Sequence, residues 1–285
     1  MGVQQVELPP ELDALAAQVK VRRQPVKGAQ HELASLLFQP PAAAEGLIVY
    51  FPGGGFIADE LELCEPFCRV LAARTKLAVL ASSYTLATEQ PFPAAVEDAH
   101  AVLSWASRYC KRKGWNAARL IVAGLEAGGN LAAVSALMAR DRGGPALAAQ
   151  ILMMPMLDPG LTTCSMRTVA ARNGGVRAAN ACAASYRDYL PHAIDRAHPY
   201  ASPLQSSRMK HLPPALILSA DDDPLRDEAE HYGAKLIAAG VPTTVRRLAP
   251  IALDDPNARC SCARKESALH EVETFIAGLR PDAAS

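Results

Sequence analysis

Residues 124–130 read Gly124-Leu125-Glu126-Ala127-Gly128-Gly129-Asn130, and this stretch decides how the rest of the chain is interpreted. The run before it, 119–123, is short and mostly apolar, which is typical of a buried parallel strand. The run that follows, 130–140, is rich in alanine and leucine and favours a helix. A strand that turns directly into a helix needs small residues on both sides of the central one, and Gly124 and Gly128 provide them. The sequence therefore predicts a strained turn that raises the carboxylate of Glu126 above the end of a sheet.

The rest of the chain alternates between strand-like and helix-like segments. Strand-like runs, most of them apolar, predict strands at residues 46–51, 77–82, 120–123, 149–154, 215–220 and 243–248. Helical patterns lie between them, at about 60–74, 92–113, 129–141, 226–239 and 264–279. This order predicts an α/β fold with a mostly parallel sheet and helices on both faces.

Two regions interrupt the alternation. Residues 1–44 carry a helix candidate at 10–19 and a strand-like stretch at 32–38, and residues 158–210 form a long insertion with a helix near 176–189. Long insertions in compact domains usually have a function, and open α/β sheets bind ligands at the carboxyl ends of their strands. We therefore expect a core of residues 45–157 and 211–285, a cap insertion of residues 158–210, and an N-terminal segment, 1–44, that contributes to the cap.

Composition limits the classes of partner. Lys and Arg number 29, as do Asp and Glu, so the net charge is zero and predicts neither nucleic acid nor membrane as a partner. No run is apolar enough to span a bilayer, and the N-terminus shows no signal-peptide pattern. Seven scattered cysteines argue against a disulfide framework and favour a reducing cytoplasm. The close pairs Cys64/Cys68 and Cys260/Cys262 lack further ligands at a matching spacing, so we expect no metal and no cofactor.

Five stretches resemble the hormone-sensitive-lipase-like branch of the α/β hydrolases, the bacterial esterases with a His-Gly-Gly-Gly motif. Tyr50-Phe51-Pro52-Gly53-Gly54-Gly55-Phe56 looks like that motif, and residues 84–95 resemble the family's Tyr-Arg-Leu-Ala-Pro-Glu-x-Pro-Phe-Pro-Ala-Ala. The glycine-rich turn at 124–130 is the third stretch. The fourth is 201–204 with 212–215, and the fifth is 223–228 with 239–242. The resemblance implies an α/β-hydrolase fold with a helical cap.

The departures from the family pattern fall on catalytic positions. The family uses a serine nucleophile in Gly-x-Ser-x-Gly, a histidine base and an aspartate that orients the histidine. By resemblance, Glu126 stands at the serine position and Leu253 at the histidine position, while Asp223 matches the aspartate. Leucine transfers no proton, so the resemblance implies an incomplete triad. The family's oxyanion hole maps to the N–H groups of Gly53, Gly54 and Ala127.

Glu126 has more than one interpretation. A carboxylate is stabilised at a helix N-terminus by roughly 0.3–1 kcal/mol, so a structural or ligand-gating role is the simplest. Related folds use an aspartate at this turn to form an ester intermediate, which keeps covalent catalysis as an alternative. We also expect that Glu126 folds into its own oxyanion hole, because donors arranged for an oxyanion suit a carboxylate.

The remaining candidates have plain structural interpretations. Asp223 precedes Pro224 and is a good N-cap for a helix, and without a histidine it has nothing to orient. His270 lies beside the apolar stripe of a predicted helix, which favours a solvated position. His192 and His198 belong to the cap and are expected at its surface.

These observations predict a catalytically inactive esterase-like protein that binds a small, largely apolar or ester-like molecule or acts through partners. The resembling family commonly forms dimers through an edge strand or helix, so a homodimer is compatible with the sequence. The first alternative is a carboxylic-ester hydrolase that uses a non-standard site around Glu126. The second is a structural subunit of a complex, which predicts a filled pocket and a large exposed apolar patch.

Overall fold

The computed structural model describes residues 10–169, 175–251, 253, 255 and 257–279. Within these residues the main sheet has the order β1-β4-β6-β5-β7-β8-β9-β10. The strands from β6 to β10 pair in parallel, whereas β1 and β4 join one edge in antiparallel pairings. In sheet order the strands are β1 (Lys20–Arg23), β4 (Ser35–Gln39), β6 (Ala78–Ser82), β5 (Leu47–Phe51), β7 (Leu120–Leu125), β8 (Ala149–Met153), β9 (Ala215–Ala220) and β10 (Thr243–Leu248). A separate pair consists of β2 (Val26–Lys27) and β3 (Glu32–Leu33).

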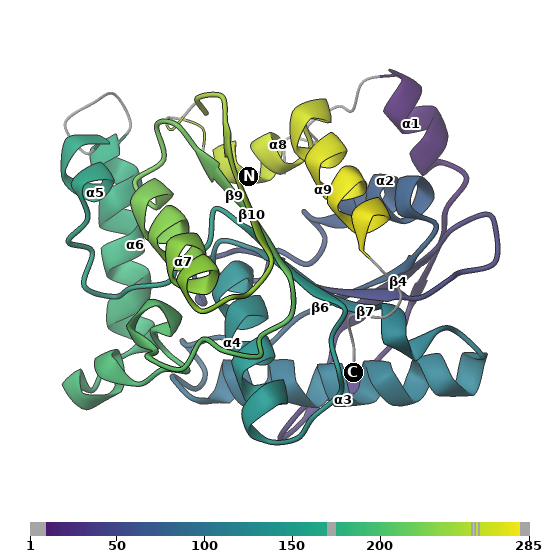
Figure 1. The fold of residues 1–285 in the computed structure, drawn as a ribbon, viewed down its shortest axis with the longest axis horizontal. Helices are drawn as coiled ribbons and strands as arrows, with labels where there is room; N and C mark the ends of the chain where they lie inside the picture. The colour runs from purple at the N-terminus through teal and green to yellow at the C-terminus, as the bar shows by residue number, and fades with distance from the viewer. Residues whose placement is uncertain (1–9, 170–174, 252, 254, 256, 280–285) are drawn as a thin grey trace.

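Helices cover both faces of this sheet, as Figure 1 shows. Along β5, Leu47, Val49 and Phe51 pack into one hydrophobic cluster, and Ile48 and Tyr50 pack into the other, because successive side chains of a strand point to opposite faces. The first cluster is covered by α3 (Ala94–Lys113), α4 (Ala127–Asp141) and α7 (Arg226–Ala238). The second is covered by α1 (Pro10–Ala16), α2 (Glu65–Thr75), α8 (Ala258–Ala263) and α9 (Glu266–Gly278). The predicted α/β fold is therefore confirmed.

Element boundaries differ from the predictions for local reasons. The helix expected from residue 60 begins at Glu65, because Pro66 fits only the first turn of a helix. The strand β1 was not predicted, since its sequence Lys-Val-Arg-Arg has a single apolar residue. An edge strand with exposed side chains does not need the apolar alternation that marks a strand in sequence.

The insertion at 158–210 contains α5 (Cys164–Val169) and α6 (Gly175–Tyr189) followed by two short 3₁₀ turns. Helix α6 packs against the loop that follows β5: the rings of Phe56 and Tyr189 stack with centroids 3.8 Å apart. A Cβ at Gly55 would lie only 2.2 Å from Ser185 Oγ. The insertion thus lies over the carboxyl end of β5.

The described part of the N-terminal segment adds strands to the main sheet. Residues 1–44 were expected to contribute to the cap; β1 and β4 of this segment belong to the main sheet, and α1 packs on α2. Most of the described part of the segment therefore extends the core.

Among the described residues, every helix is too short or too polar to span a bilayer.

Candidate functional site

The turn between β7 and α4 has the strained backbone that its glycines predict. Glu126 has φ 55° and ψ −112°, a conformation that side-chain-bearing residues rarely adopt. A Cβ added at Gly124 would lie 2.0 Å from the carbonyl oxygen of Gly128, and one added at Gly128 would lie 2.0 Å from that of Phe51. Glycine is thus required on both sides, and the turn projects the Glu126 side chain beyond the carboxyl end of β7.

The Glu126 carboxylate is held by two donors. Its Oε2 accepts a hydrogen bond from the N–H of Gly54 at 3.2 Å, and its Oε1 accepts one from Arg259 at 3.1 Å. Gly53 is adjacent, because a Cβ built on it would lie 2.9 Å from Glu126 Oε2. The carboxylate therefore points toward the expected oxyanion hole. Of the three predicted donors, Gly54 is the one that binds Glu126 in the described part of the chain.

Arg259 completes an arrangement that we call the ion triad: Glu126, Arg259 and Asp223. The Arg259 Nε and one terminal nitrogen donate to the two Asp223 oxygens at 2.8 and 2.9 Å, and the other terminal nitrogen reaches Glu126. The Asp223 side chain is 1% exposed, compared with 15% for Arg259 and 19% for Glu126. Burial is the largest single effect and lowers the pKa of Arg259, but the charge and hydrogen bonds of Asp223, together with Cys182 and Glu126, raise the pKa of Arg259 above its ordinary value.

The structure corrects the expectation that Asp223 has no side chain to orient, because both of its carboxylate oxygens bind Arg259. Helix α7 begins at Arg226, and Asp223 Oδ1 accepts the N–H of Leu225 at 2.9 Å. Asp223 is therefore not the N-cap residue itself but stands two residues before it, with both oxygens also bound to Arg259. Sequence reasoning missed Arg259, although it is the single basic residue between 249 and 262 in the segment that lacks a histidine.

Leu253 and the histidines are not members of the ion triad. Leu253 packs, half-buried, against the hydrophobic cluster under α2 and α9. His270 is exposed on α9, as expected from its position beside the apolar stripe. His192 is exposed too, and the ring of His198 contacts Phe92 and Tyr200 rather than Glu126. Within the described residues, no imidazole forms a hydrogen bond or ion pair with Glu126 or Asp223.

A second carboxyl group, that of Glu60, meets Glu126 above Gly53. A Cβ at Gly53 would lie 3.0 Å from Glu60 Oε2 and 2.9 Å from Glu126 Oε2, so the two carboxyl groups are close neighbours. Burial and then the charge of Glu126 raise the pKa of Glu60 to about 7, against the opposing effect of Arg259. At neutral pH the Glu60 carboxyl group beside Glu126 is therefore partly protonated.

Glu60 should make the stability of the protein depend on pH. Its pKa in the folded state, about 7, is higher than the ordinary value of 4.5, so the folded state keeps a proton that the unfolded chain has released. This contribution to stability is complete below pH 4.5 and is lost as the pH rises through about 7. We expect the stability of the wild type, measured relative to Glu60→Gln by urea unfolding, to fall between pH 4.5 and pH 8. The exposed Glu89→Gln is the control, and a flat difference for Glu60→Gln would contradict the assignment.

The comparisons with known proteins agree with this architecture. A family model described as alpha/beta hydrolase fold matches residues 48–250. The chain belongs to the α/β-hydrolase family. Esterase LipI of Mycobacterium tuberculosis is 38% identical over 210 residues, covering 72% of this chain and 64% of LipI. Carboxylesterase NlhH of the same species is 33% identical over 245 residues, covering 82% of this chain and 76% of NlhH. An esterase structure from Pyrobaculum calidifontis superposes with a TM-score of 0.82 at 32% identity, covering 96% of this chain and 90% of the other.

These relatives support the hormone-sensitive-lipase-like assignment made from the five motifs. The chain spans less than two thirds of LipI, whose covered share is 64%. In this α/β hydrolase the hydroxyl of Tyr84, from one of the five motifs, donates to the carbonyl of Gly53 at 2.6 Å. Thr85 from the same motif donates its N–H to Asp98 at 2.9 Å. The Tyr84 contact thus holds the glycine loop, residues 53–55, which faces Glu126.

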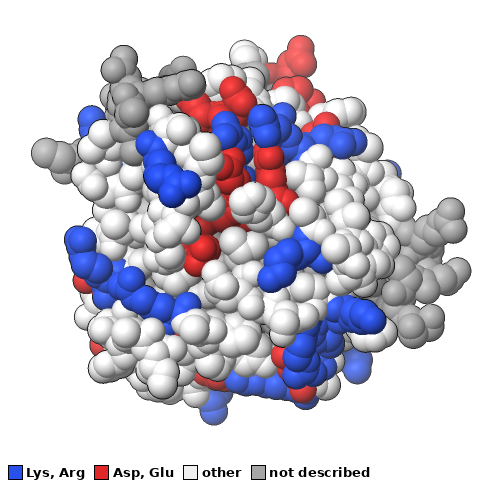
Figure 2. All heavy atoms as spheres, turned by 60° about the vertical axis from the view of Figure 1, so that its left-hand side comes forward, with Lys and Arg blue, Asp and Glu red and all other residues white. Residues whose placement is uncertain are grey.

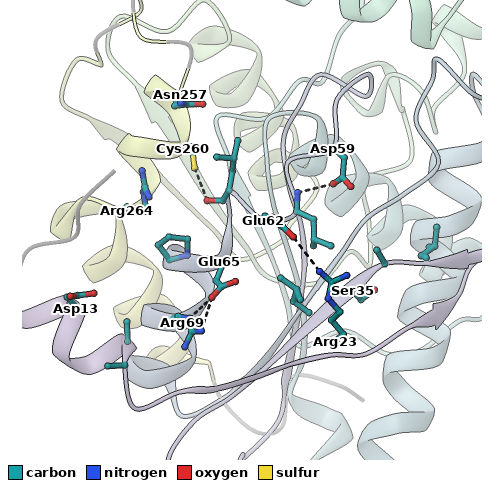
Figure 3. A pocket seen from close by; sticks show the side chains of 18 of the residues that line it. Asp13, Arg23, Ser35, Asp59, Glu62, Glu65, Arg69, Asn257, Cys260 and Arg264 are labelled. Carbon is teal, nitrogen blue, oxygen red and sulfur yellow. Dashed lines mark hydrogen bonds and ion pairs between the residues drawn. The ribbon is translucent and has the colours of Figure 1, made fainter. Parts of the chain in front are cut away.

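A groove of about 1690 Å³ adjoins the triad of this α/β hydrolase without including it. Its walls come from α1, the start of α2, the segment 32–36 and α8, and Figure 3 shows Asp59, Glu62 and Cys260 at its centre. Leucines and prolines line much of it, among ion pairs such as Arg69–Glu65 at 2.7 Å. Asp59 and Glu62 of the groove flank Glu60, whose carboxyl group lies beside Gly53. A ligand in the groove would therefore contact a segment of the site.

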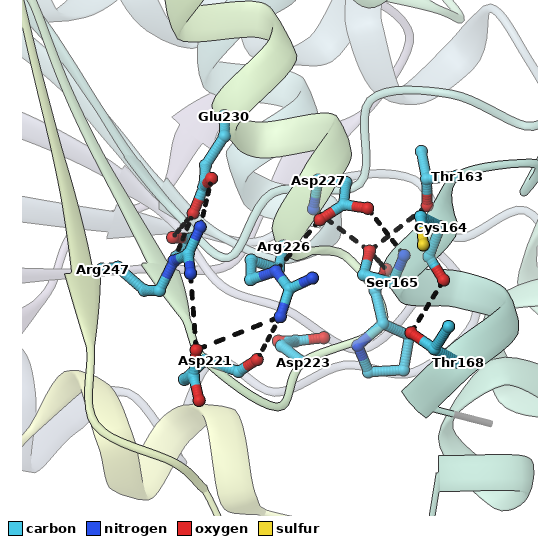
Figure 4. A network of polar contacts seen from close by, with 12 residues as sticks. Thr163, Cys164, Ser165, Thr168, Asp221, Asp223, Arg226, Asp227, Glu230 and Arg247 are labelled. Carbon is cyan, nitrogen blue, oxygen red and sulfur yellow. Dashed lines mark hydrogen bonds and ion pairs between the residues drawn. The ribbon is translucent and has the colours of Figure 1, made fainter. Parts of the chain in front are cut away.

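The cap insertion is tied to the segment that presents Asp223. The N–H of Ser165, in α5, donates to Asp227 at 2.6 Å, and its hydroxyl donates to the carbonyl of Pro224 at 2.7 Å (Figure 4).

Arg226 pairs with Asp227 at 3.0 Å and Arg247 with Glu230 at 2.7 Å. Figure 2 shows acidic side chains in one band on the face formed by the left side of Figure 1, with basic side chains beside them. On this face, opposite charges are therefore neighbours.

Among the residues that the structure describes, no group of three or more His, Cys, Asp or Glu side chains could hold a metal ion. The described cysteines are all free thiols, and Cys64, Cys68 and Cys262 are buried.

Proposed function

We propose that this protein is a non-hydrolytic member of the α/β-hydrolase family that binds a small, largely apolar molecule. The ion triad carries the proposal, because it occupies the space where the family's serine, histidine and aspartate would act. By the motif alignment, Glu126 takes the serine position and Arg259 supplies the charged partner of Asp223. Neither side chain offers the activated hydroxyl or the neutral base that ester cleavage by this family needs.

The oxyanion donors give a second reason. Removing a single such donor from an esterase-type site costs about 2.7–4 kcal/mol of transition-state stabilisation. Here the N–H of Gly54 already donates to Glu126, so an ester carbonyl would have to displace a carboxylate that Arg259 also holds. The site is thus filled by an internal anion. The adjoining groove, where leucines and prolines alternate with charged side chains, is the cavity that we assign to a small ligand whose apolar part contacts those leucines and prolines.

A carboxylic-ester hydrolase is the second candidate, and the relatives favour it. LipI, NlhH and the Pyrobaculum calidifontis protein are all named as esterases. In this alternative Glu126 would act as a nucleophile or base, with Arg259 holding the carboxylate in place. A structural subunit is the third candidate and would need a large exposed apolar patch. It ranks last because the described large apolar residues with high exposure, Val176, Ile194 and Ile237, come from three different elements.

Hydrolysis of a panel of short p-nitrophenyl esters tests the proposal. We expect the wild type, Glu126→Ala and Glu126→Ser to stay at the background rate, because Glu126→Ser still lacks a base. The triple variant Glu126→Ser, Leu253→His, Arg259→Ala should gain activity, since it frees Asp223 to orient an imidazole. The Pyrobaculum calidifontis esterase is the positive control, and Glu89→Ser, prepared in parallel, reports any contaminating esterase. Turnover by the wild type that Glu126→Ala abolishes would support the hydrolase instead.

A further inference from the structure

A basic and aromatic surface lies far from the ion triad. Its basic residues come from the end of α3 and from the edge strand β1, and its aromatic residues from α3 and the turn after it. We call it the basic–aromatic surface: Lys20, Arg22, Arg108, Lys111, Arg112 and Lys113, with Trp105, Tyr109 and Trp115. The Arg22 guanidinium donates to the Tyr109 hydroxyl at 2.5 Å and joins the two elements.

The basic side chains of this surface have no acidic partners. All six are exposed, and among the described residues none forms an ion pair. Many other arginines are paired, as in Arg142–Glu97 at 2.7 Å and Arg74–Glu266 at 2.7 Å. Residues 99–125 contain five basic residues and no acidic one. A net charge of zero therefore conceals a local excess of positive charge.

Both tryptophans of the chain belong to this surface. Trp105 stacks on Tyr109 with ring centroids 4.6 Å apart, and Trp115 meets Tyr109 edge-on at 5.6 Å. Arg112 and Lys113 lie 5.6 and 5.7 Å from the centre of the Tyr109 ring. Both tryptophans are half-buried. Each therefore has an apolar body packed on the protein and a remaining part that reaches solvent.

The surface faces away from the ion triad. Helix α3 starts near the cap, where the N–H of Phe92 donates to the carbonyl of Tyr189, and ends at Lys113, just before β7 begins. Its last turn therefore lies at the amino end of the parallel strands, whereas Glu126 lies at the carboxyl end of β7. Figure 1 shows α3 along the lower edge of the molecule. A partner bound at the surface would leave the triad open.

We propose that the basic–aromatic surface docks the protein on a bilayer that contains anionic phospholipid. Lys and Arg near such a bilayer each favour binding, and tryptophan is enriched at the boundary between headgroups and acyl chains. Six unpaired basic side chains around two half-buried tryptophans provide both interactions. This assignment replaces the expectation, drawn from net charge, that a membrane is not a partner.

A nucleic acid fits the surface less well. Single-stranded nucleic acids bind by stacking bases on free aromatic faces along a groove. Here Trp105 and Tyr109 cover each other's faces, and two cations lie against Tyr109. Four of the six basic residues lie in one short segment, 108–113, rather than in a row that could follow a nucleic-acid backbone.

Tryptophan fluorescence tests the proposal without a label, because both tryptophans lie in the surface. We expect vesicles of phosphatidylcholine with phosphatidylglycerol to shift the emission to shorter wavelength in a saturable way, and pure phosphatidylcholine vesicles to leave it unchanged. In 0.5 M NaCl the shift should disappear, since the Debye length falls to a few ångströms. Arg108→Ala with Lys111→Ala should weaken binding, measured by vesicle cosedimentation, about fivefold for each charge removed.

The matched control removes two positive charges elsewhere, with Lys210→Ala and Lys265→Ala, and should bind like the wild type. Circular dichroism of both double variants establishes that they are folded. Equal binding to neutral and anionic vesicles, or equal weakening by the control, would overturn the proposal. Tighter, salt-sensitive binding to an oligonucleotide than to the anionic vesicles would assign the surface to nucleic acid and overturn it as well.

Discussion

Arg259→Ala should lower the free energy of unfolding by about 3–5 kcal/mol, because it leaves two carboxylates without their cation in a desolvated place. Asp223 is 1% exposed and would lose both of its bonds to the guanidinium, at 2.8 and 2.9 Å. Glu126 would lose its partner at 3.1 Å and would face Glu60 with only the N–H of Gly54 to compensate. Urea unfolding at pH 7 measures the effect.

A matched surface pair shows whether burial causes the loss. Arg246 pairs with Glu271 at 3.1 Å, and the two side chains are 54% and 29% exposed. Arg246→Ala should therefore cost under about 1 kcal/mol. Combining Arg259→Met with Glu126→Gln and Asp223→Asn should recover part of the stability, since no buried charge then remains. A loss below about 1 kcal/mol for Arg259→Ala would mean that the ion triad contributes little, in the range of an exposed pair.

Gly128→Ala should destabilise the fold by about 3 kcal/mol or more, through overpacking at the turn. The new Cβ would lie 2.0 Å from the carbonyl oxygen of Phe51 and 2.4 Å from that of Pro52, and both are backbone atoms. Relief therefore requires that α4 move away from β5, which would also separate Glu126 from the glycine loop. Thermal and urea unfolding measure the loss of stability.

Gly278→Ala is the control for this change. A Cβ at Gly278 meets nothing within 4 Å at the end of α9, so alanine there should be neutral or stabilise by up to about 1 kcal/mol. If Gly128→Ala proved as mild as Gly278→Ala, the close approach of α4 and β5 at the turn would be wrong.

Most of the fold could be predicted because most of its parallel strands are buried on both faces and appear as short apolar runs. The buried strand β9 coincides with the predicted 215–220, and the partly exposed edge strand β10 coincides with the predicted 243–248. The strand β1 escaped prediction because an exposed edge strand needs no apolar pattern, and its antiparallel pairing with β4 is set by tertiary contacts. The expected contribution of residues 1–44 to the cap stays a prediction, while β1 and β4 of this segment join the main sheet.

The candidate site could be predicted only where its residues lie in the motifs. Glu126, Gly54 and Asp223 follow from their positions in such stretches, and the structure places them in one site. Arg259 comes from a segment that departs from the family pattern, so no motif pointed to it. Glu60 lies outside the motifs, and its raised pKa arises from burial and from the nearness of Glu126, which only the folded chain shows.

The ion triad also constrains how this chain could change over evolutionary time. Serine alone at position 126 would leave the guanidinium of Arg259 bound to Asp223 and would supply no base. Loss of Arg259 alone would leave two carboxylates without a cation. A histidine introduced alone at position 253 could not bind Asp223, because both oxygens of Asp223 are already bound to Arg259. Under the proposed non-hydrolytic function, each single substitution gives either an unstable protein or an inactive one, so ester hydrolysis would require several substitutions together. Glu126, Arg259 and Asp223 thus form a unit in which no residue can be replaced alone without a loss.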